Sequence, residues 1–259
     1  MKARFSKLTL VTVALLSLTA CSQSKLDASK SSAKEVTKQT STKSSAKAYT
    51  VTDGSKKGSG EASSKAGKPD VKLDAGVTYN GSYYSVKGKY GEVMIANKHY
   101  PLSPDFNPGE DAKVVAALHE LIAAMQAEGY PIRDQYSGFR SYETQVGLYQ
   151  NYVNQDGQAA ADRYSARPGY SEHQTGLAFD LIDTSGNLVT EPVPSKWLLK
   201  NAAKYGFVVR YQEGKEKETG YVPESWHLRY IGKEAQEIAD SGLSLEEYYG
   251  FTGGDYVDK

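Results

Sequence analysis

Two of the four histidines lie among residue types that bind metal ions or move protons. His173 and Asp180 lie in the segment Ser-Glu-His-Gln-Thr-Gly-Leu-Ala-Phe-Asp, and Glu224 and His227 lie in Glu-Ser-Trp-His. Asp180 is inside an apolar run, where an isolated carboxylate costs several kcal/mol unless a cation or hydrogen-bond donors compensate it. We therefore expect a charged or donating partner for Asp180.

Imidazole nitrogen and carboxylate oxygen both suit Zn²⁺, and a catalytic zinc site has three protein ligands and one open position. His173, Asp180 and His227 would supply such a set for one zinc ion per chain. Glu224 precedes His227 by three positions, where a general base belongs. Such a site activates water to attack a carbonyl. Arg140, at the end of an expected strand, is the candidate to stabilise the tetrahedral intermediate.

Three motifs resemble those of a known family. The D-alanyl-D-alanine carboxypeptidases of the VanY and LdcB type, in the hedgehog-like metallopeptidase group, have the patterns Ser-x-His-x-x-Gly-x-Ala-x-Asp, Glu-x-x-His and Ser-Gly-Tyr-Arg-Ser-x-x-x-Gln. The first matches residues 171–180, the second residues 224–227, and the third residues 137–145 with Phe139 in place of Tyr. The resemblance spans most of residues 90–245.

This resemblance implies a zinc peptidase that acts on the peptide stems of bacterial peptidoglycan. It implies His173, Asp180 and His227 as ligands, Glu224 as base and Arg140 as oxyanion stabiliser. It also implies that Ser171 and Gln145 line the substrate cleft. The implied fold is a single α+β domain with a small mixed or antiparallel sheet flanked by helices.

The exact bond that is cleaved stays open. An L,D-carboxypeptidase removes the terminal D-Ala from tetrapeptide stems, and the resemblance to LdcB favours this activity. The alternatives are a D,D-carboxypeptidase acting on pentapeptide stems and a non-catalytic peptidoglycan-binding or adhesin lipoprotein. Glu224 favours an enzyme, because a binding module needs no base beside its metal.

Other catalytic classes lack their residues. The Ser-x-x-Lys pattern of penicillin-binding serine peptidases occurs near the N-terminus, as at residues 31–34 and 44–47, among many Ser and Lys, and no Lys-Thr-Gly occurs. The one cysteine, Cys21, lies in the leader, which excludes thiol catalysis. His119-Glu120 begins a helical zinc motif, but Ala123 stands where that motif needs His. His99 follows the turn expected at Asn97-Lys98, and we expect it to be solvated.

The elements that must position the site can be expected from periodicity and from turn and cap signals. A hairpin is expected in 83–102. A helix that begins after Ser141 is expected to bury Val146, Tyr149 and Val153. The other expected elements are helices at 110–128, 195–205 (ended by Gly206), 233–240 and 245–249, and strands at 132–139, 177–182, 207–211 and 226–230. Helices and strands mix without strict alternation, which favours an α+β fold.

Charge is segregated along the 259 residues although the formal net charge is zero. Residues 22–70 carry ten Lys against five acids, whereas residues 71–259 carry 18 basic against 26 acidic residues. An acidic folded part argues against a nucleic-acid partner.

The first 70 residues are expected to export and tether the domain. Residues 1–21 have a basic start and an apolar run too short to span a bilayer of about 30 Å, and they end in a lipobox-like Leu-Thr-Ala-Cys. Lipidation of Cys21 would anchor the chain to the membrane outside the cell, facing the wall; the alternative is a plain cleaved signal. Residues 22–70, rich in Ser, Lys and Ala, are expected to be a disordered tether, and residues 71–259 the catalytic domain.

Overall fold

A four-stranded antiparallel sheet lies at the centre of the part of the chain that the computed structural model describes, residues 71–257. Its strands follow the spatial order β4 (Ile132–Ser137), β5 (Ala178–Asp183), β7 (Glu224–Tyr230) and β6 (Phe207–Tyr211). The expected leader, the tether and Cys21 lie outside the described residues, so the boundaries at 21 and 70 stay predictions.

A smaller antiparallel sheet precedes it in the chain. Its strands are β1 (Thr78–Tyr79), β2 (Tyr84–Gly88) and β3 (Gly91–Ile95). The β2–β3 hairpin confirms the expectation for residues 83–102. The helices are α1 (Ala112–Ala127), α2 (Tyr142–Asp156), α3 (Gln158–Tyr164), α4 (Pro192–Asn201), α5 (Glu216–Thr219), α6 (Ala235–Ser241) and α7 (Leu245–Tyr249), with 3₁₀ turns η1 (Glu172–Thr175), η2 (Ala202–Tyr205) and η3 (Gly232–Glu234).

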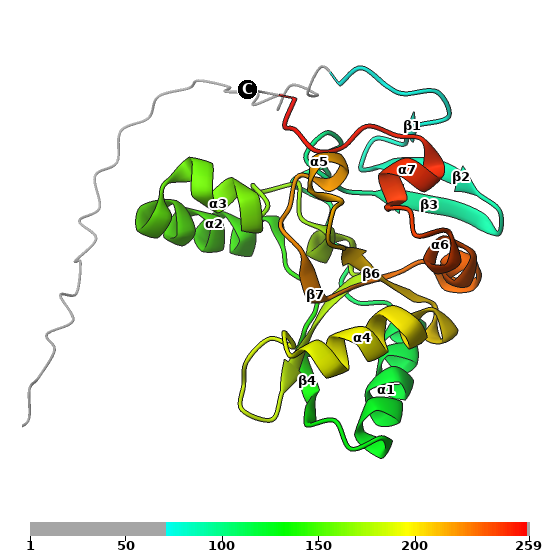
Figure 1. Ribbon diagram of the computed structural model, residues 1–259. Coiled ribbons are helices and arrows are strands. Elements are labelled where there is room, and N and C mark those ends of the chain that lie inside the picture. The colour runs from blue at the N-terminus through cyan, green and yellow to red at the C-terminus, as the bar shows by residue number, and fades with distance from the viewer. Residues whose placement is uncertain (1–70, 258–259) are drawn as a thin grey trace, which may run out of the picture. The chain divides into compact units, whose positions relative to one another are not determined.

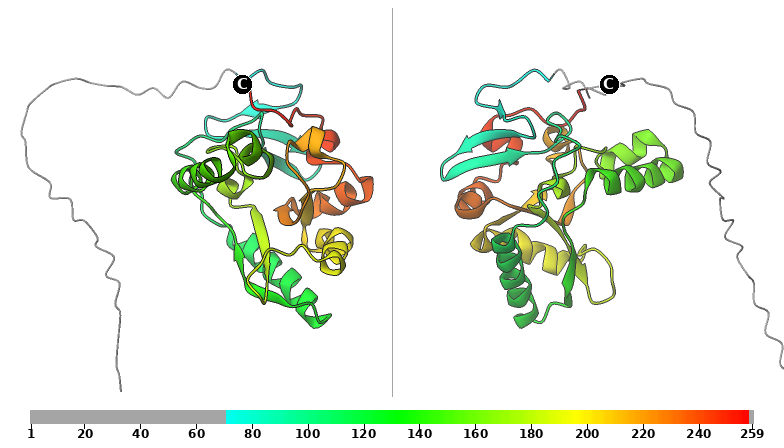
Figure 2. Two further views of the ribbon diagram at one scale, coloured as in Figure 1. Left: turned by 60° about the vertical axis from the view of Figure 1, so that its left-hand side comes forward. Right: turned by 180° about the vertical axis from the view of Figure 1, so that it is seen from behind.

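The two faces of the central sheet pack against different layers. In Figure 1, α1 and α4 lie on one side of this sheet, the small sheet with α6 and α7 lies on the other, and α2 and α3 project from the domain. Figure 2 shows the same projection from behind. The first hydrophobic core includes Phe179 of β5, Leu228 of β7 and Val209 of β6, together with residues of α1 and α4. The second core joins Val208 of β6 to the small sheet, α6 and α7.

Strand alternation places the site on the face toward the second core. Residues directly opposite in paired strands share a face. Asp180 pairs with His227, and Arg229 pairs with both Ala178 and Val208. The intervening residues Phe179 and Leu228 belong to the first core on the opposite face. The polar residues of β5 and β7 are therefore segregated from the main apolar core.

The structure confirms the α+β class and most of the expected elements, but it corrects the burial of α2. Ser141 caps α2 as expected, through its side chain and the Thr144 N–H. Val146 is nevertheless 44% exposed, and the buried residue of this helix is Gln145. The reason is that α2 packs sideways on α3, where the Tyr149 hydroxyl donates to Asp162 at 2.6 Å, and not on an apolar core.

Further differences concern short elements and helix ends. The periodicity did not indicate α3, and the expected helix 195–205 is α4 followed by η2, with Gly206 ending it at φ 84°.

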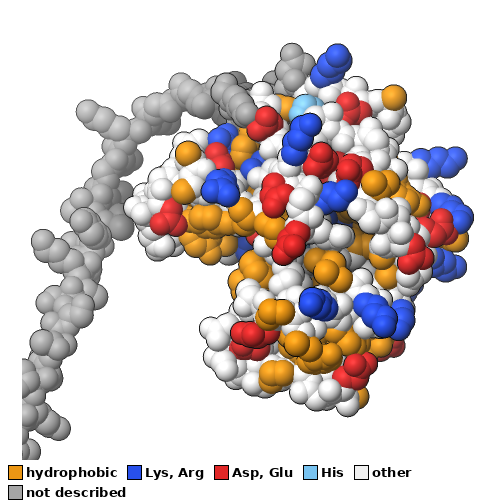
Figure 3. Space-filling model, viewed as in Figure 1, with side chains coloured by type: hydrophobic (Ala, Val, Ile, Leu, Met, Phe, Trp, Pro, Cys, Tyr) orange, Lys and Arg blue, Asp and Glu red, His pale blue; other side chains and the backbone are white. Residues whose placement is uncertain are grey.

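Figure 3 shows acidic and basic side chains interspersed over the face in view. Among residues 71–257, helices of the length and apolarity needed to cross a bilayer are absent.

Candidate active site

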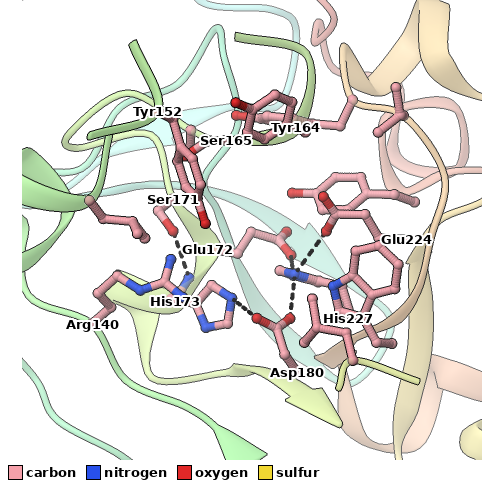
Figure 4. Close-up of a pocket in the computed structure, with 17 residues that line it drawn as sticks. Arg140, Tyr152, Tyr164, Ser165, Ser171, Glu172, His173, Asp180, Glu224 and His227 are labelled. Atoms are coloured by element: carbon pink, nitrogen blue, oxygen red, sulfur yellow. Dashed lines mark hydrogen bonds and ion pairs between the residues drawn. The ribbon is translucent and has the colours of Figure 1, made fainter. Parts of the chain in front are cut away.

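The residues expected to do chemistry meet in one cavity of about 330 Å³. Figure 4 shows His173, Asp180 and His227 facing one another, with Glu224 and Arg140 on opposite sides of them. Aromatic and apolar residues form much of the remaining wall: Leu148, Tyr152, Tyr164, Leu188, Tyr211, Tyr221, Val222 and Trp226.

The three predicted ligands converge tightly. One ligand atom from each of His173, Asp180 and His227 lies within 4.8 Å of the others, and all three residues are buried. His173 Nε2 lies 3.1 Å from Asp180 Oδ2, and His227 Nδ1 lies 3.2 Å from Asp180 Oδ1. Two adjacent strands supply Asp180 and His227 as a direct cross-strand pair, and η1 supplies His173.

Each histidine has a hydrogen-bond partner for its other nitrogen. His173 Nδ1 lies 2.8 Å from the Gly138 carbonyl, which can only accept, so Nδ1 carries the proton. His227 Nε2 lies 3.2 Å from Glu172 Oε2, a carboxylate oxygen that likewise accepts a hydrogen bond. In the neutral form of each ring, the remaining nitrogen, which faces Asp180, is the one that can bind a metal. Such outer partners commonly orient metal-binding histidines.

The residues present fit a zinc ion. Asp180 Oδ1 is buried and accepts no hydrogen bond, although His227 Nδ1 is 3.2 Å away. Burial lowers the pKa of His227, but Asp180 and Glu172 raise it to about 9 overall, so the surroundings favour a positive charge here. Two imidazole nitrogens and one carboxylate oxygen are a donor set that zinc prefers.

Glu224 faces the same cavity because β7 departs from regular pairing. In a regular strand, residues three apart point to opposite faces. The register of β6 and β7 shifts between Val209 and Tyr211, so that Tyr211 pairs with Glu224 while Val209 pairs with Leu228. Within this irregular stretch, Glu224 Oε2 lies 3.6 Å from His227 Nδ1. Burial raises the pKa of Glu224 to about 7, against the lowering effect of His227.

Arg140 is held from behind by two polar side chains. Its Nη1 donates to Gln145 Oε1 at 3.0 Å, and its Nη2 donates to Ser137 Oγ at 3.2 Å. Gln145 in turn donates to the Ala166 carbonyl at 2.7 Å. Gln145 was expected to line the cleft, but it is 1% exposed and is not among the residues that line the cavity. Both ends of its amide are occupied by protein partners.

Ser171 lines the cavity as expected and also caps η1. Its Oγ accepts a hydrogen bond from the His173 N–H at 3.3 Å. The turn ends at Gly176 with φ 71°, and a Cβ there would lie 2.0 Å from the Gly109 carbonyl oxygen. Glycine is therefore required where the chain leaves η1 for β5.

Sequence reasoning missed Glu172. This residue contacts His227 and the guanidinium groups of Arg210 and Arg229, and all four side chains are buried. An available signal was the presence of an arginine in each of two expected strands, 207–211 and 226–230, since a buried guanidinium calls for an acidic partner. The remaining histidines lie apart from this cluster, with His99 Nε2 3.4 Å from the Lys72 carbonyl.

The fold and the buried His-Asp-His set with an adjacent glutamate define a metallopeptidase type of site. A family model described as VanY, D-alanyl-D-alanine carboxypeptidase, matches residues 109–233. A crystal structure of the L,D-carboxypeptidase DacB from Streptococcus pneumoniae is 70% identical, with a TM-score of 0.69, and the match covers 72% of this chain and all of that chain. The chain belongs to the VanY D-alanyl-D-alanine carboxypeptidase family.

Further relatives extend the comparison. The LdcB LD-carboxypeptidase, whose structure is described as revealing peptidoglycan recognition, is 70% identical (TM-score 0.69), covering 70% of this chain and 97% of that one. A variant of the D,D-pentapeptidase VanY from a VanB-type cassette, with Zn(II), is 32% identical (TM-score 0.52), covering 60% and 96%. A D-alanyl-D-alanine carboxypeptidase from Enterococcus faecalis is 39% identical over 60% of this chain and 65% of its own. The chain spans less than two thirds of the length of the curated relatives it matches.

Proposed function

We propose that this chain is a zinc-dependent L,D-carboxypeptidase that removes the C-terminal D-Ala from peptidoglycan tetrapeptide stems. The observation that carries the proposal is the convergence of His173, Asp180 and His227 beside Glu224, in a chain 70% identical to an L,D-carboxypeptidase over that enzyme's whole solved length. In this proposal, the three residues hold one zinc ion.

When bound, zinc would polarise the scissile carbonyl and acidify a water molecule. The chain's own side chains transfer the proton and stabilise the developing charge. Glu224 takes a proton from the attacking water as the new bond to the carbonyl carbon forms. It then gives that proton to the nitrogen of the departing D-Ala as the peptide bond breaks. Its burial beside His227, with Oε2 at 3.6 Å from Nδ1, suits this exchange.

Arg140 stabilises the negative charge that develops on the carbonyl oxygen. Its hydrogen bonds to Gln145 and Ser137 hold the guanidinium before the substrate arrives, so little reorganisation is needed. Ser171 provides a polar group on the cavity wall for the peptide backbone. The tyrosines of the wall exclude water and pack against the stem.

A D,D-carboxypeptidase acting on pentapeptide stems is the second candidate. The family description and the resemblance to the D,D-pentapeptidase VanY favour it. A non-catalytic peptidoglycan-binding or adhesin role is less well supported, because Glu224 has no function in such a protein. We also propose that the chain works outside the cell, anchored by a lipid on Cys21 and held near the wall by residues 22–70.

The proposal is tested by measuring D-alanine release from a muramyl tetrapeptide by the purified chain. Treatment with a zinc chelator should abolish release, and added zinc should restore it. Release that survives complete removal of metal would contradict the zinc-dependent mechanism.

A further inference from the structure

Glu172 lies on the far side of His227 from Asp180. Its Oε2 is 3.2 Å from His227 Nε2, whereas Asp180 Oδ1 is 3.2 Å from Nδ1 on the other edge of the ring. A neutral imidazole carries one proton, and the position of that proton decides which nitrogen can bind a metal. A carboxylate at Nε2 keeps the proton there and leaves the Nδ1 lone pair free.

Two arginines fix the orientation of the Glu172 carboxylate. Arg210 Nε donates to Glu172 Oε1 at 2.8 Å, and Arg229 Nη1 donates to the same oxygen at 3.0 Å. The three side chains are each 1% exposed. Because Oε1 accepts from both guanidinium groups, Oε2 is the oxygen that faces His227. Oε1 therefore accepts from the two arginines, and Oε2 accepts from His227.

The same arginines reach the small sheet and α7. Arg229 Nη2 donates to the Met94 carbonyl of β3 at 2.7 Å. Arg210 donates twice to Glu246 of α7, at 2.8 and 2.6 Å. Glu246 also accepts from Asn97, just after β3, at 3.1 Å. A buried, fully partnered network thus runs from His227 to elements at both ends of the described chain.

We propose that Glu172 is a positioning residue that holds His227 with Nδ1 toward the metal, and that Arg210 and Arg229 tie this support to β3 and α7. The inference deepens the proposed function and rests on its metal site. It also extends that site, because β3 and α7 lie outside residues 109–233, the region that the family model matches. In this chain, β3 and α7 therefore help to hold the metal ligand His227, although the family model does not match them.

The substitution Glu172→Gln tests the orientation directly. Guanidinium groups only donate, so the amide oxygen of the new side chain would stay with the arginines and its NH₂ group would face His227 Nε2. The Nε2 atom would then have to accept, and the proton would move to Nδ1, where it blocks metal binding. Zinc affinity of the full chain in detergent, measured by chelator competition, should fall by about 10–100-fold, the usual range for outer partners.

Two further variants separate positioning from loss of structure. Glu234→Gln is the matched control, since Glu234 is also a buried glutamate and accepts from the Lys89 N–H at 3.0 Å. The zinc affinity of this variant should equal that of the parent. Glu172→Gln leaves two buried cations with one buried anion, which can prevent folding. The double variant Glu172→Gln/Arg229→Gln restores the charge balance and should still bind zinc more weakly than the parent.

Side-chain ¹⁵N NMR of the zinc-loaded parent gives a readout that requires no variant. The proposal predicts that His227 carries its proton on Nε2 and binds zinc through Nδ1. The opposite arrangement would overturn it. A folded double variant that binds zinc as tightly as the parent would also overturn it and leave the proposed function standing, whereas a parent chain that binds no zinc would overturn both.

Discussion

Glu224 and His227 depend on the irregular pairing of β7 for their shared orientation. In a regular strand, residues three apart would face opposite sides of the sheet, but the pairing of β7 with β6 is irregular near Glu224. Their 3.6 Å separation places a carboxylate next to the ligand set while Asp180, not Glu224, pairs directly with His227. The glutamate is therefore placed to move protons.

Replacement of Glu224 tests this role. Glu224→Gln should retain zinc at one ion per chain while kcat falls by about 10²–10⁴-fold, the usual contribution of a general acid-base group. Metal analysis and D-alanine release would be measured on the same samples. Glu237→Gln, which removes an exposed carboxylate on α6, serves as the control. A kcat within a few-fold of the parent would refute the assignment of the base.

Gln145 provides a second test at the scale of a residue. Gln145→Met keeps the size of the side chain but removes the acceptor at 3.0 Å from Arg140. A hydrogen bond to a charged group is worth about 1.5–3 kcal/mol, so kcat/KM should fall by roughly 10–100-fold with unchanged zinc content. Gln145→Glu, which retains an acceptor for Arg140, should recover part of the loss. Equal activity of the parent and Gln145→Met would show that Arg140 needs no such support.

The grouping of His173, Asp180, His227 and Glu224 could be predicted from the sequence, whereas the contacts that support it could not. The types of these four residues and their spacing along the chain are enough to indicate a metal site with a general base. The role of Glu172 depends on arginines from β6 and β7, which approach it only in three dimensions. Gln145 was expected to line the cleft, but it is buried and accepts a hydrogen bond from Arg140. This too could not be predicted, because the packing of α2 in three dimensions decides which of its residues are buried.

At the scale of elements, strong periodicity and clear end signals gave reliable predictions. The expected helix 245–249 coincides with α7, and Gly206 ends η2 as expected. The prediction for α2 was correct in position but wrong for Val146, which is exposed while Tyr149 and Val153 are half-buried, because α2 packs on the short α3, whose sequence lacks an apolar period. The apolar residues of α2 therefore did not reveal which side it buries.

The turn between η1 and β5 makes a prediction about stability. Gly176→Ala forces a side chain into a left-handed conformation and against the Gly109 carbonyl, so the free energy of unfolding should fall by at least about 1–3 kcal/mol. Gly147→Ala, in α2 with nothing within 4 Å of the added Cβ, should instead stabilise the chain by about 0.5–1 kcal/mol. Denaturant unfolding measures both, and effects of the same sign would contradict this interpretation.

At the scale of the whole molecule, residues 71–257 contain every predicted site residue except Cys21. We therefore predict that removal of residues 1–70 leaves kcat on soluble stem peptides unchanged. Cys21→Ser in the full chain should shift the protein from the membrane fraction to the medium, measured by fractionation. A large loss of activity on truncation would show that the first 70 residues contribute to catalysis, and unchanged membrane association of Cys21→Ser would exclude the lipid anchor.

The measurement that tests the central claim most directly is mass spectrometry of the products from tetrapeptide and pentapeptide stems. Each stem is incubated separately with the zinc-loaded chain, with and without a chelator. We predict chelator-sensitive loss of one D-Ala from the tetrapeptide and an intact pentapeptide. Cleavage of the pentapeptide alone would contradict the L,D assignment and indicate a D,D-carboxypeptidase, and the absence of product from both stems would contradict the assignment of an enzyme.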